Sequence, residues 1–206
     1  MGLAVQARDE VIERFSLQHF QIDRLDHFVT LFTQWNARIS LVSAKDSARI
    51  WSRHIPEALW LADFMRAADW VLDLGSGGGF PGLITVINTG VPHKLVESDQ
   101  RKAAFLCEAV RQLELEVEVI AARIENLDPL GAPCITARAL ASLPRLLSYA
   151  QLHLVSEGLC LFPKGANVQQ EIDAARQNGW MFHVKQFSNP CDSNLCLLEI
   201  RNLTKS

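Results

Sequence analysis

The chain has 206 residues, of which 49% are hydrophobic and 21% are charged, so it can bury a sizeable core. No apolar run approaches membrane-spanning length, and five cysteines without a C-x-x-C pair favour reduced thiols over a disulfide framework. A net charge of −3 excludes attraction of nucleic acid by the whole protein, so any RNA must be held by a local basic patch. We therefore expect a cytoplasmic protein without a membrane anchor.

The first third of the chain has a helical period, and we predict an N-terminal helical extension over residues 1–67. Apolar residues three and four apart form one face of the first predicted helix: Leu25, Phe28, Leu31, Phe32 and Trp35. A second helical run is expected over about 48–65. The polar connector 39–47 joins the two runs and offers a candidate helix cap at Asp46 or Ser47.

From residue 68 to 206, short apolar runs alternate with helical segments, which is typical of a parallel sheet covered on both faces. Strands are predicted at about 70–74, 94–97, 117–121, 133–137 and 158–162. Helices are predicted at about 82–89, 99–112, 142–153 and 167–178. Two final strands, 181–187 and 195–201, have no helix between them and should pair antiparallel as a hairpin. The predicted class is α/β, a mostly parallel seven-stranded sheet like that of many Rossmann-like class I methyltransferases.

A glycine-rich loop follows the first predicted strand, which ends near Asp73. Five glycines fall within eight residues: Gly75, Gly77, Gly78, Gly79 and Gly82. Such a loop at the carboxyl end of a strand is the usual nucleotide-cofactor crevice of an open α/β sheet. The dinucleotide pattern would need glycine at Phe80, and no Gly-Lys-Ser/Thr follows to make a phosphate loop. The spacing favours S-adenosylmethionine over NAD or ATP.

The next two strand ends supply candidates for the other walls of this cofactor site. Gly75 and Gly77 would let the backbone approach the amino-acid and ribose portions closely. Glu97 follows at about the interval at which an acidic residue accepts hydrogen bonds from ribose hydroxyls, although a solvated glutamate is the alternative. Ile124 is positioned to pack on adenine while Glu125 or the backbone reads its amino edge, unless this segment simply opens a helix.

Arg138 ends the fourth predicted strand and should face the same crevice. Its guanidinium fork is suited to holding a carboxylate or a phosphate. A salt bridge to Glu97 or Asp99 is an equally good interpretation.

Several motifs together carry a specific resemblance: DLGSGGGFPG, ESDQRKAAFL, ARIENL, TARALASL and FPKG, with Trp35-Asn36 and Arg53-His54 upstream. Over about residues 25–200 the chain resembles the glucose-inhibited division protein B family, the bacterial small-subunit ribosomal RNA (guanine-N7) methyltransferases. One departure is Ser40-Leu41-Val42, where the family often has Asn-Leu-Thr. The resemblance implies an enzyme that uses S-adenosylmethionine to methylate N7 of a guanine in 16S rRNA. It carries the family's cofactor positions onto Gly75, Phe80, Ile124-Glu125 and Arg138.

That reaction fits what the residues can do, because guanine N7 already has an in-plane lone pair and needs no base. Arg138 is then a positioning residue, since proximity and orientation supply most of the rate. Cytosine C5 methylation would need a cysteine at the end of the fourth strand, whereas Cys134 stands at its start. Predicted RNA contacts are Arg53, His54, Arg101, Lys102 and Lys164.

Two other functions remain as alternatives, and no metal ligand set is predicted. One is a small-molecule methyltransferase, which would have an enclosed apolar pocket without a basic rim. The other is an NAD(P)-dependent oxidoreductase or a nucleotide-binding module, which Phe80 disfavours. The expected partner is 16S rRNA or the small ribosomal subunit, bound by a monomer.

Overall fold

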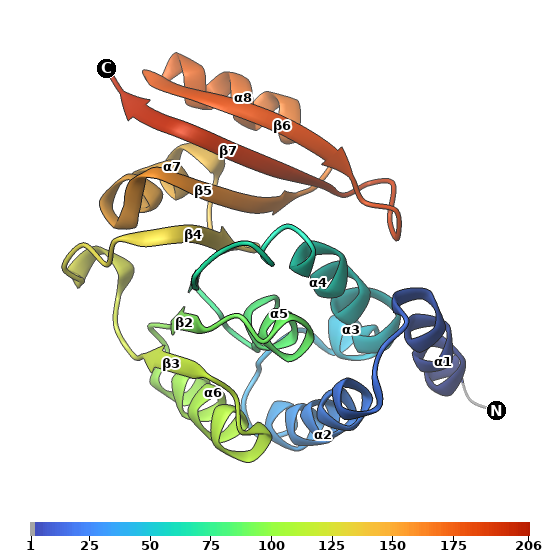
Figure 1. Cartoon of the computed structure of the whole chain (residues 1–206). Coiled ribbons are helices and arrows are strands. Elements are labelled where there is room, and N and C mark those ends of the chain that lie inside the picture. Colours follow the sequence, from blue (N-terminus) through green and yellow to red (C-terminus); the bar gives the residue numbers. More distant parts are fainter. Residues whose placement is uncertain (1–2) are drawn as a thin grey trace.

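The computed structural model describes residues 3–206, so the first two residues of the predicted extension lie outside the described part. Seven strands form one sheet in the order β3-β2-β1-β4-β5-β7-β6 (Figure 1). Their bounds are β1 Val71–Leu74, β2 His93–Val96, β3 Val117–Ile120, β4 Ala132–Ala137, β5 Leu154–Lys164, β6 Trp180–Ser188 and β7 Cys196–Lys205. Strands β1 to β5 run parallel, and β7 pairs antiparallel with both β5 and β6. The predicted fold class and C-terminal hairpin are confirmed.

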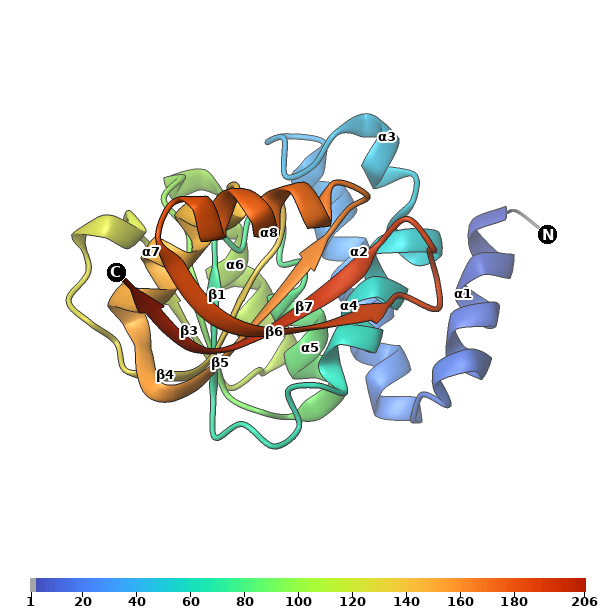
Figure 2. The same cartoon turned by 90° about the horizontal axis from the view of Figure 1, so that it is seen from above.

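Helices cover both faces of this sheet. They are α1 Leu3–Phe15, α2 His19–Asn36, α3 Ala44–Ser47, α4 Ile55–Ala62, α5 Gly82–Thr89, α6 Gln100–Leu113, α7 Leu143–His153 and α8 Val168–Gln177. Helices α7 and α8 pack against β4 to β7, and α4, α5 and α6 lie on the opposite face (Figure 2). Among residues 3–206, none of the helices has the length and apolarity needed to cross a bilayer.

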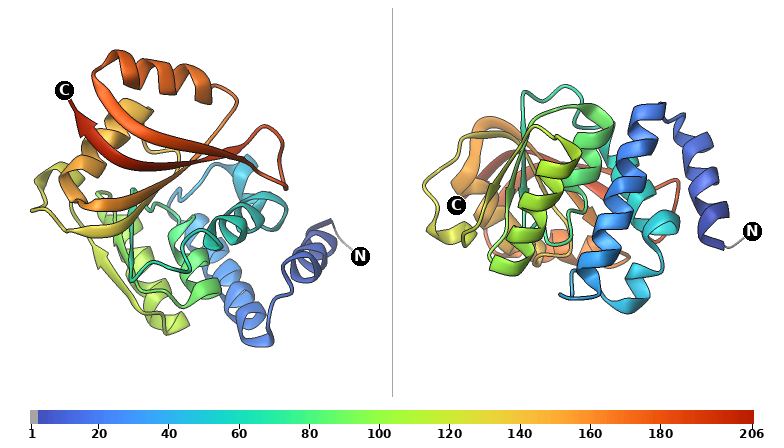
Figure 3. Two further views of the ribbon diagram at one scale, coloured as in Figure 1. Left: turned by 45° about the horizontal axis from the view of Figure 1, so that its top comes forward. Right: turned by 90° about the horizontal axis from the view of Figure 1, so that it is seen from below.

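The N-terminal helices share one core with the sheet's own helices. Helix α2 lies between α1 and α6 (Figure 3), and its Phe28 and Phe32 are fully buried. Their rings lie 5.3 and 5.5 Å from the ring of Phe80 and about as close to Phe105 of α6, at 6.4 and 6.0 Å. Burial of each such ring stabilises the fold by about 2 kcal/mol. The glycine loop is thereby attached to the N-terminal helices through Phe80.

The predicted helix over 48–65 is divided in the structure. A π-helical turn, η1, covers Ile50–His54, and α4 then runs only to Ala62. Pro56 stands in the first turn of α4, where its missing N–H costs no helical hydrogen bond. The prediction of a cap at Asp46 or Ser47 was wrong, because Ser43 caps α3 by accepting from the Asp46 N–H at 3.1 Å. The Asp46 carboxylate in turn accepts from the Ser43 hydroxyl at 2.6 Å.

Candidate active site

The glycine loop begins where β1 ends, and its conformation requires glycine at two positions. Gly75 has φ +70°, a conformation that side chains rarely adopt. At Gly82 a Cβ atom would stand 2.6 Å from Asp73 Oδ2 and 2.5 Å from Leu95, so only glycine fits. Asp73 is completely buried, and this burial raises the pKa of its carboxyl to about 7. The Phe-Pro-Gly end of the loop therefore closes over an acid at the core of the sheet.

Glu97 holds the middle of the loop against the end of β2. One carboxylate oxygen accepts from the Gly77 N–H at 2.8 Å, and the other accepts from the Asp99 N–H at 2.8 Å. Glu97 is only 8% exposed, which removes the interpretation of a solvated surface glutamate. Each carboxylate oxygen keeps a further lone pair with which to accept from a ligand hydroxyl.

A cavity of about 650 Å³, which we call the glycine-loop cavity, lies where the ends of β1, β2, β3 and β4 meet. The predicted cofactor residues in its lining are Gly75, Gly77, Glu97, Ile124, Glu125 and Arg138, and Lys102 also lines it. Parallel strands end at the same edge of a sheet, which is why residues from four separate loops converge here.

The side chain of Phe80 packs against residues of the N-terminal helices. Its ring is 8% exposed and packs among aromatic rings, 5.3 Å from Phe28 and 5.2 Å from His54. The side chain lies outside the lining of the glycine-loop cavity. The Phe80 ring therefore anchors the loop to the N-terminal helices, and a contact of Phe80 with the cofactor stays a prediction.

Glu125 is fixed at the rim of the cavity by two donors from α7. Its Oε1 atom accepts from Tyr149 Oη at 2.8 Å and from Arg145 Nη2 at 2.9 Å. Its own backbone N–H, then Tyr149 and Arg145, lower the pKa of Glu125 to about 2. Glu125 is therefore a fixed anionic acceptor at this rim. Ile124 beside it is 7% exposed and supplies an apolar surface.

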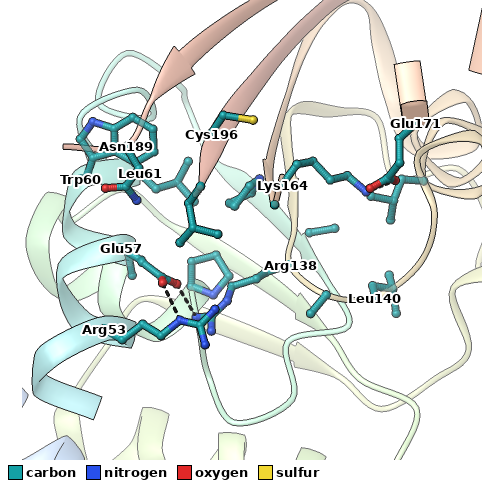
Figure 4. Close-up of a pocket in the computed structure, with 18 of the residues that line it drawn as sticks. Arg53, Glu57, Trp60, Leu61, Arg138, Leu140, Lys164, Glu171, Asn189 and Cys196 are labelled. Carbon is teal, nitrogen blue, oxygen red and sulfur yellow. Dashed lines mark hydrogen bonds and ion pairs between the residues drawn. The ribbon is translucent and has the colours of Figure 1, made fainter. Parts of the chain in front are cut away.

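Arg138 pairs with residues from the N-terminal helices, so the alternative interpretation, a salt bridge to Glu97 or Asp99, was wrong. Its Nη2 atom donates to His54 Nδ1. Its Nη1 atom lies 3.5 Å from Glu57 Oε2, a contact that Figure 4 shows. Local pattern placed Arg138 at a strand end but could not supply a partner that lies about 80 residues earlier in the chain. Burial lowers the pKa of Arg138, which remains a cation.

His54 is buried behind Arg138 and is neutral. Burial, and next the charge of Arg138, lower the pKa of its imidazole to about 4. A guanidinium only donates, so His54 Nδ1 must accept and the ring proton sits on Nε2. With 2% of its surface exposed, His54 does not meet the prediction of a phosphate contact on the surface.

A second cavity, of about 440 Å³, lies on the other side of Arg138, and we call it the Arg138–Lys164 cavity (Figure 4). Three ion pairs line it: Glu57 pairs with both Arg53 and Arg138, and Lys164 pairs with Glu171 at 2.7 Å. Its apolar walls are Trp60, Leu61, Leu140 and Pro163. Residues 138–141 line both cavities, so the turn after β4 is the partition between them.

The second cavity also contains three residues that the sequence did not predict as part of a site: Glu57, Trp60 and Glu171. The only local signal was the spacing of Glu57 four residues after Arg53, which places both side chains on one helical face. The structure joins them, with Arg53 Nε donating to Glu57 Oε1 at 2.9 Å.

The remaining predicted RNA contacts do not form a single patch. Lys164 is 9% exposed and donates to Glu171 Oε2 and to the Ala141 carbonyl, so it is a buried cation of the second cavity. Arg53 lines that same cavity, whereas Lys102 lines the glycine-loop cavity. Arg101 lies at the exposed start of α6 beside Asp99.

Known proteins resemble this chain in both sequence and fold. The family model described as "GidB: rRNA small subunit methyltransferase G" matches residues 21–196. The ribosomal RNA small subunit methyltransferase G of Gluconobacter oxydans is 52% identical over 161 residues, which are 78% of this chain and 83% of that relative. The protein of the same name from a Cereibacter sphaeroides strain is 39% identical over 203 residues, covering 95% of this chain and 98% of that relative.

Two solved structures show the same fold at low sequence identity. An O-methyltransferase from Bacillus cereus in complex with SAH has a TM-score of 0.64 at 12% identity, with 94% of this chain and 96% of that chain covered. M. jannaschii TYW2 in complex with AdoMet has a TM-score of 0.58 at 14% identity, with 82% and 80% covered. The fold is that of a class I methyltransferase, and the length of the family match shows that the chain belongs to the rRNA small subunit methyltransferase G (GidB) family.

Proposed function

We propose that the protein transfers a methyl group from S-adenosylmethionine to N7 of a guanine in 16S rRNA. The observation that carries this proposal is the pair of cavities that meet at Arg138, one lined by the glycine loop and the other by three ion pairs. S-adenosylmethionine supplies an electrophilic methyl group that is bound to a sulfonium. A donor cavity beside a separate acceptor cavity is what a transfer between two molecules requires.

The residues of the glycine-loop cavity fit each part of the cofactor. The open backbone at Gly77 lets a ligand approach closely, because a Cβ there would meet nothing nearer than 3.8 Å. Glu97 offers carboxylate lone pairs to ribose hydroxyls, and Ile124 offers an apolar surface to adenine. Glu125 is an anionic acceptor suited to the adenine amino group.

The chain's own residues hold and orient rather than move protons. Guanine N7 presents a lone pair without losing a proton, so the reaction needs no general base. His54 Nδ1 is already engaged by Arg138, which makes His54 a support for that arginine. Burial raises the pKa of the Cys134 thiol to about 12, so it is not a nucleophile at neutral pH. Arg138, fixed by His54 and Glu57, orients the two substrates at the partition.

The alternative of a small-molecule methyltransferase is less well supported. It predicts an enclosed apolar pocket, whereas the second cavity contains the charged groups of Arg53, Arg138 and Lys164. We propose Lys102, Arg101 and Arg53 as the groups that meet RNA phosphates, and a monomer acting in the cytoplasm. Each phosphate contact that is removed should lower the slope of log affinity against log salt by about one.

The test is to incubate the protein with labelled S-adenosylmethionine and either naked 16S rRNA or undermethylated 30S subunits. The proposal predicts label as 7-methylguanosine after nuclease digestion of at least one substrate. Comparison of the two substrates also identifies the form of RNA that is used. Label at another atom, or transfer only to small molecules in an extract, would refute the proposal.

A further inference from the structure

We infer that the Arg138–Lys164 cavity receives the accepting guanine as an unstacked base, and that Glu57 reads the N1–H and 2-amino groups of that base. This inference rests on the proposed function and adds a site for the base and a residue that determines specificity. Enzymes that modify a base commonly take it out of the stack into a pocket and recognise its Watson–Crick edge there.

The cavity has the surfaces that a flat purine needs. Its apolar walls include Trp60 and Leu140, and the Trp60 ring is held edge-on by Phe64 at 5.5 Å. Stacking on an aromatic side chain stabilises any base, because every base has a π face, so these walls supply affinity without selectivity. Selectivity must come from the polar groups.

The polar groups match guanine and oppose adenine. Guanine presents O6 as an acceptor next to N1–H and the 2-amino group as donors. Arg138 and Glu57 place a donor and an acceptor side by side, with Nη1 and Oε2 3.5 Å apart. Adenine would turn its 6-amino donor to the arginine and its N1 acceptor to the carboxylate, so both contacts would be repulsive.

The two groups are also held ready for a ligand. Glu57 is 10% exposed as a side chain, and its Oε1 atom is fixed by Arg53, which leaves Oε2 beside the cavity. Arg138 Nη1 is a buried donor that lies 3.5 Å from Glu57 Oε2 and makes no hydrogen bond among residues 3–206. A buried donor without an acceptor costs free energy, and a bound O6 would remove that cost.

The same placement directs N7 toward the cofactor. N7 adjoins O6 on the purine, and Arg138 lines both cavities. A guanine with O6 at Arg138 therefore turns N7 to the partition, where the glycine-loop cavity begins, and turns its 2-amino group away. The charge pattern of the cavity thus fixes both the identity of the base and the atom that is methylated.

The experiment compares 16S rRNA carrying guanosine at the methylated position with ligated 16S rRNA carrying inosine there, which lacks only the 2-amino group. We measure kcat/KM for both RNAs with the wild-type protein, Glu57→Gln and the matched control Glu118→Gln, an exposed glutamate on β3 outside both cavities. The wild type and Glu118→Gln should prefer guanosine by about tenfold or more. In Glu57→Gln that preference should fall to less than about threefold.

The ratio of kcat/KM for the two RNAs shows whether Glu57 recognises the base or only holds other side chains in place. If Glu57 only held Arg53 and Arg138, Glu57→Gln would slow both RNAs equally and the wild-type preference would persist, which overturns the inference. Equal use of guanosine and inosine by the wild type overturns it as well. In both cases the proposed function stands, because 7-methylguanosine is still formed. Absence of N7 methylation with the wild type would instead refute the function itself.

Discussion

The two cavities that meet at Arg138 are stabilised in opposite ways. On the glycine-loop side, the carboxyl group of Asp73 is completely buried and has no cationic partner at ion-pair distance among residues 3–206. On the other side, Arg138 and Lys164 pair with carboxylates, and a neutral histidine supports Arg138. The first arrangement favours protonation of a buried acid, and the second favours deprotonation of a buried imidazole. The two sides should therefore respond oppositely to pH.

The largest predicted effect concerns Asp73. Its folded pKa of about 7 lies above the unfolded value of 3.8, so the folded state binds more protons between pH 4 and 7. The free energy of unfolding of the wild type should therefore fall, relative to Asp73→Asn, by up to about 4 kcal/mol as the pH rises through this window. Urea unfolding at a series of pH values measures the difference.

The matched control for Asp73 is Asp69→Asn, an exposed aspartate just before β1. It should leave the pH dependence of stability unchanged. A difference between wild type and Asp73→Asn that is constant from pH 4 to 7 would contradict the predicted burial of this acid.

The next largest predicted effect concerns binding of the cofactor by the glycine loop. Gly75 and Gly90 both have φ +70°, a conformation that asparagine tolerates, but of the two Gly75 alone lines the glycine-loop cavity. A Cβ at Gly75 would lie 2.7 Å from Leu140, whereas one at Gly90 would meet nothing within 4 Å. Gly75→Asn should weaken S-adenosylmethionine binding about thirtyfold, or 2 kcal/mol, by calorimetry. Equal losses in Gly75→Asn and Gly90→Asn would show that backbone strain, not the cavity, is responsible.

The smallest effect concerns His54, on the other side of Arg138. Its folded pKa of about 4 lies below the unfolded value of 6.5, so the unfolded state binds more protons between these values. The stability of the wild type relative to His54→Gln should therefore fall as the pH drops from 6.5 to 4, by roughly 1.5 kcal/mol after solvent screening. The control His19→Gln removes a solvent-exposed imidazole and should show no such trend. A rise in relative stability toward low pH would mean that His54 is charged in the fold.

Sequence pattern predicted most of the fold because its signals are local. The helix 82–89 was predicted with the bounds that α5 has, since a glycine-rich turn precedes it and Gly90 ends it in a left-handed conformation. Strand β5 begins at Leu154 rather than at 158, because α7 passes into it without a loop. Pairing with neighbouring strands can bring such a segment into the sheet even where its residues do not alternate between apolar and polar.

The two cavities differ in how far the sequence could predict them. The glycine-loop cavity is made of residues that follow consecutive strands, and parallel strands bring those residues together by necessity. The Arg138–Lys164 cavity joins α4 to the ends of β4, β5 and β7, and no local period indicates which helix residue will face which strand end. Glu57 and Glu171 could therefore be found only in the folded structure. The packing of the Phe80 ring could not be predicted for a related reason, because its partners lie on α2.

The division of roles between the two cavities is tested most directly by a crystal structure with S-adenosylhomocysteine bound. We expect electron density for the ligand in the glycine-loop cavity, with its ribose at Glu97 and its purine beside Ile124. The Arg138–Lys164 cavity should then remain accessible for the guanine. Density for the ligand's purine in the Arg138–Lys164 cavity would contradict the assignment of both cavities.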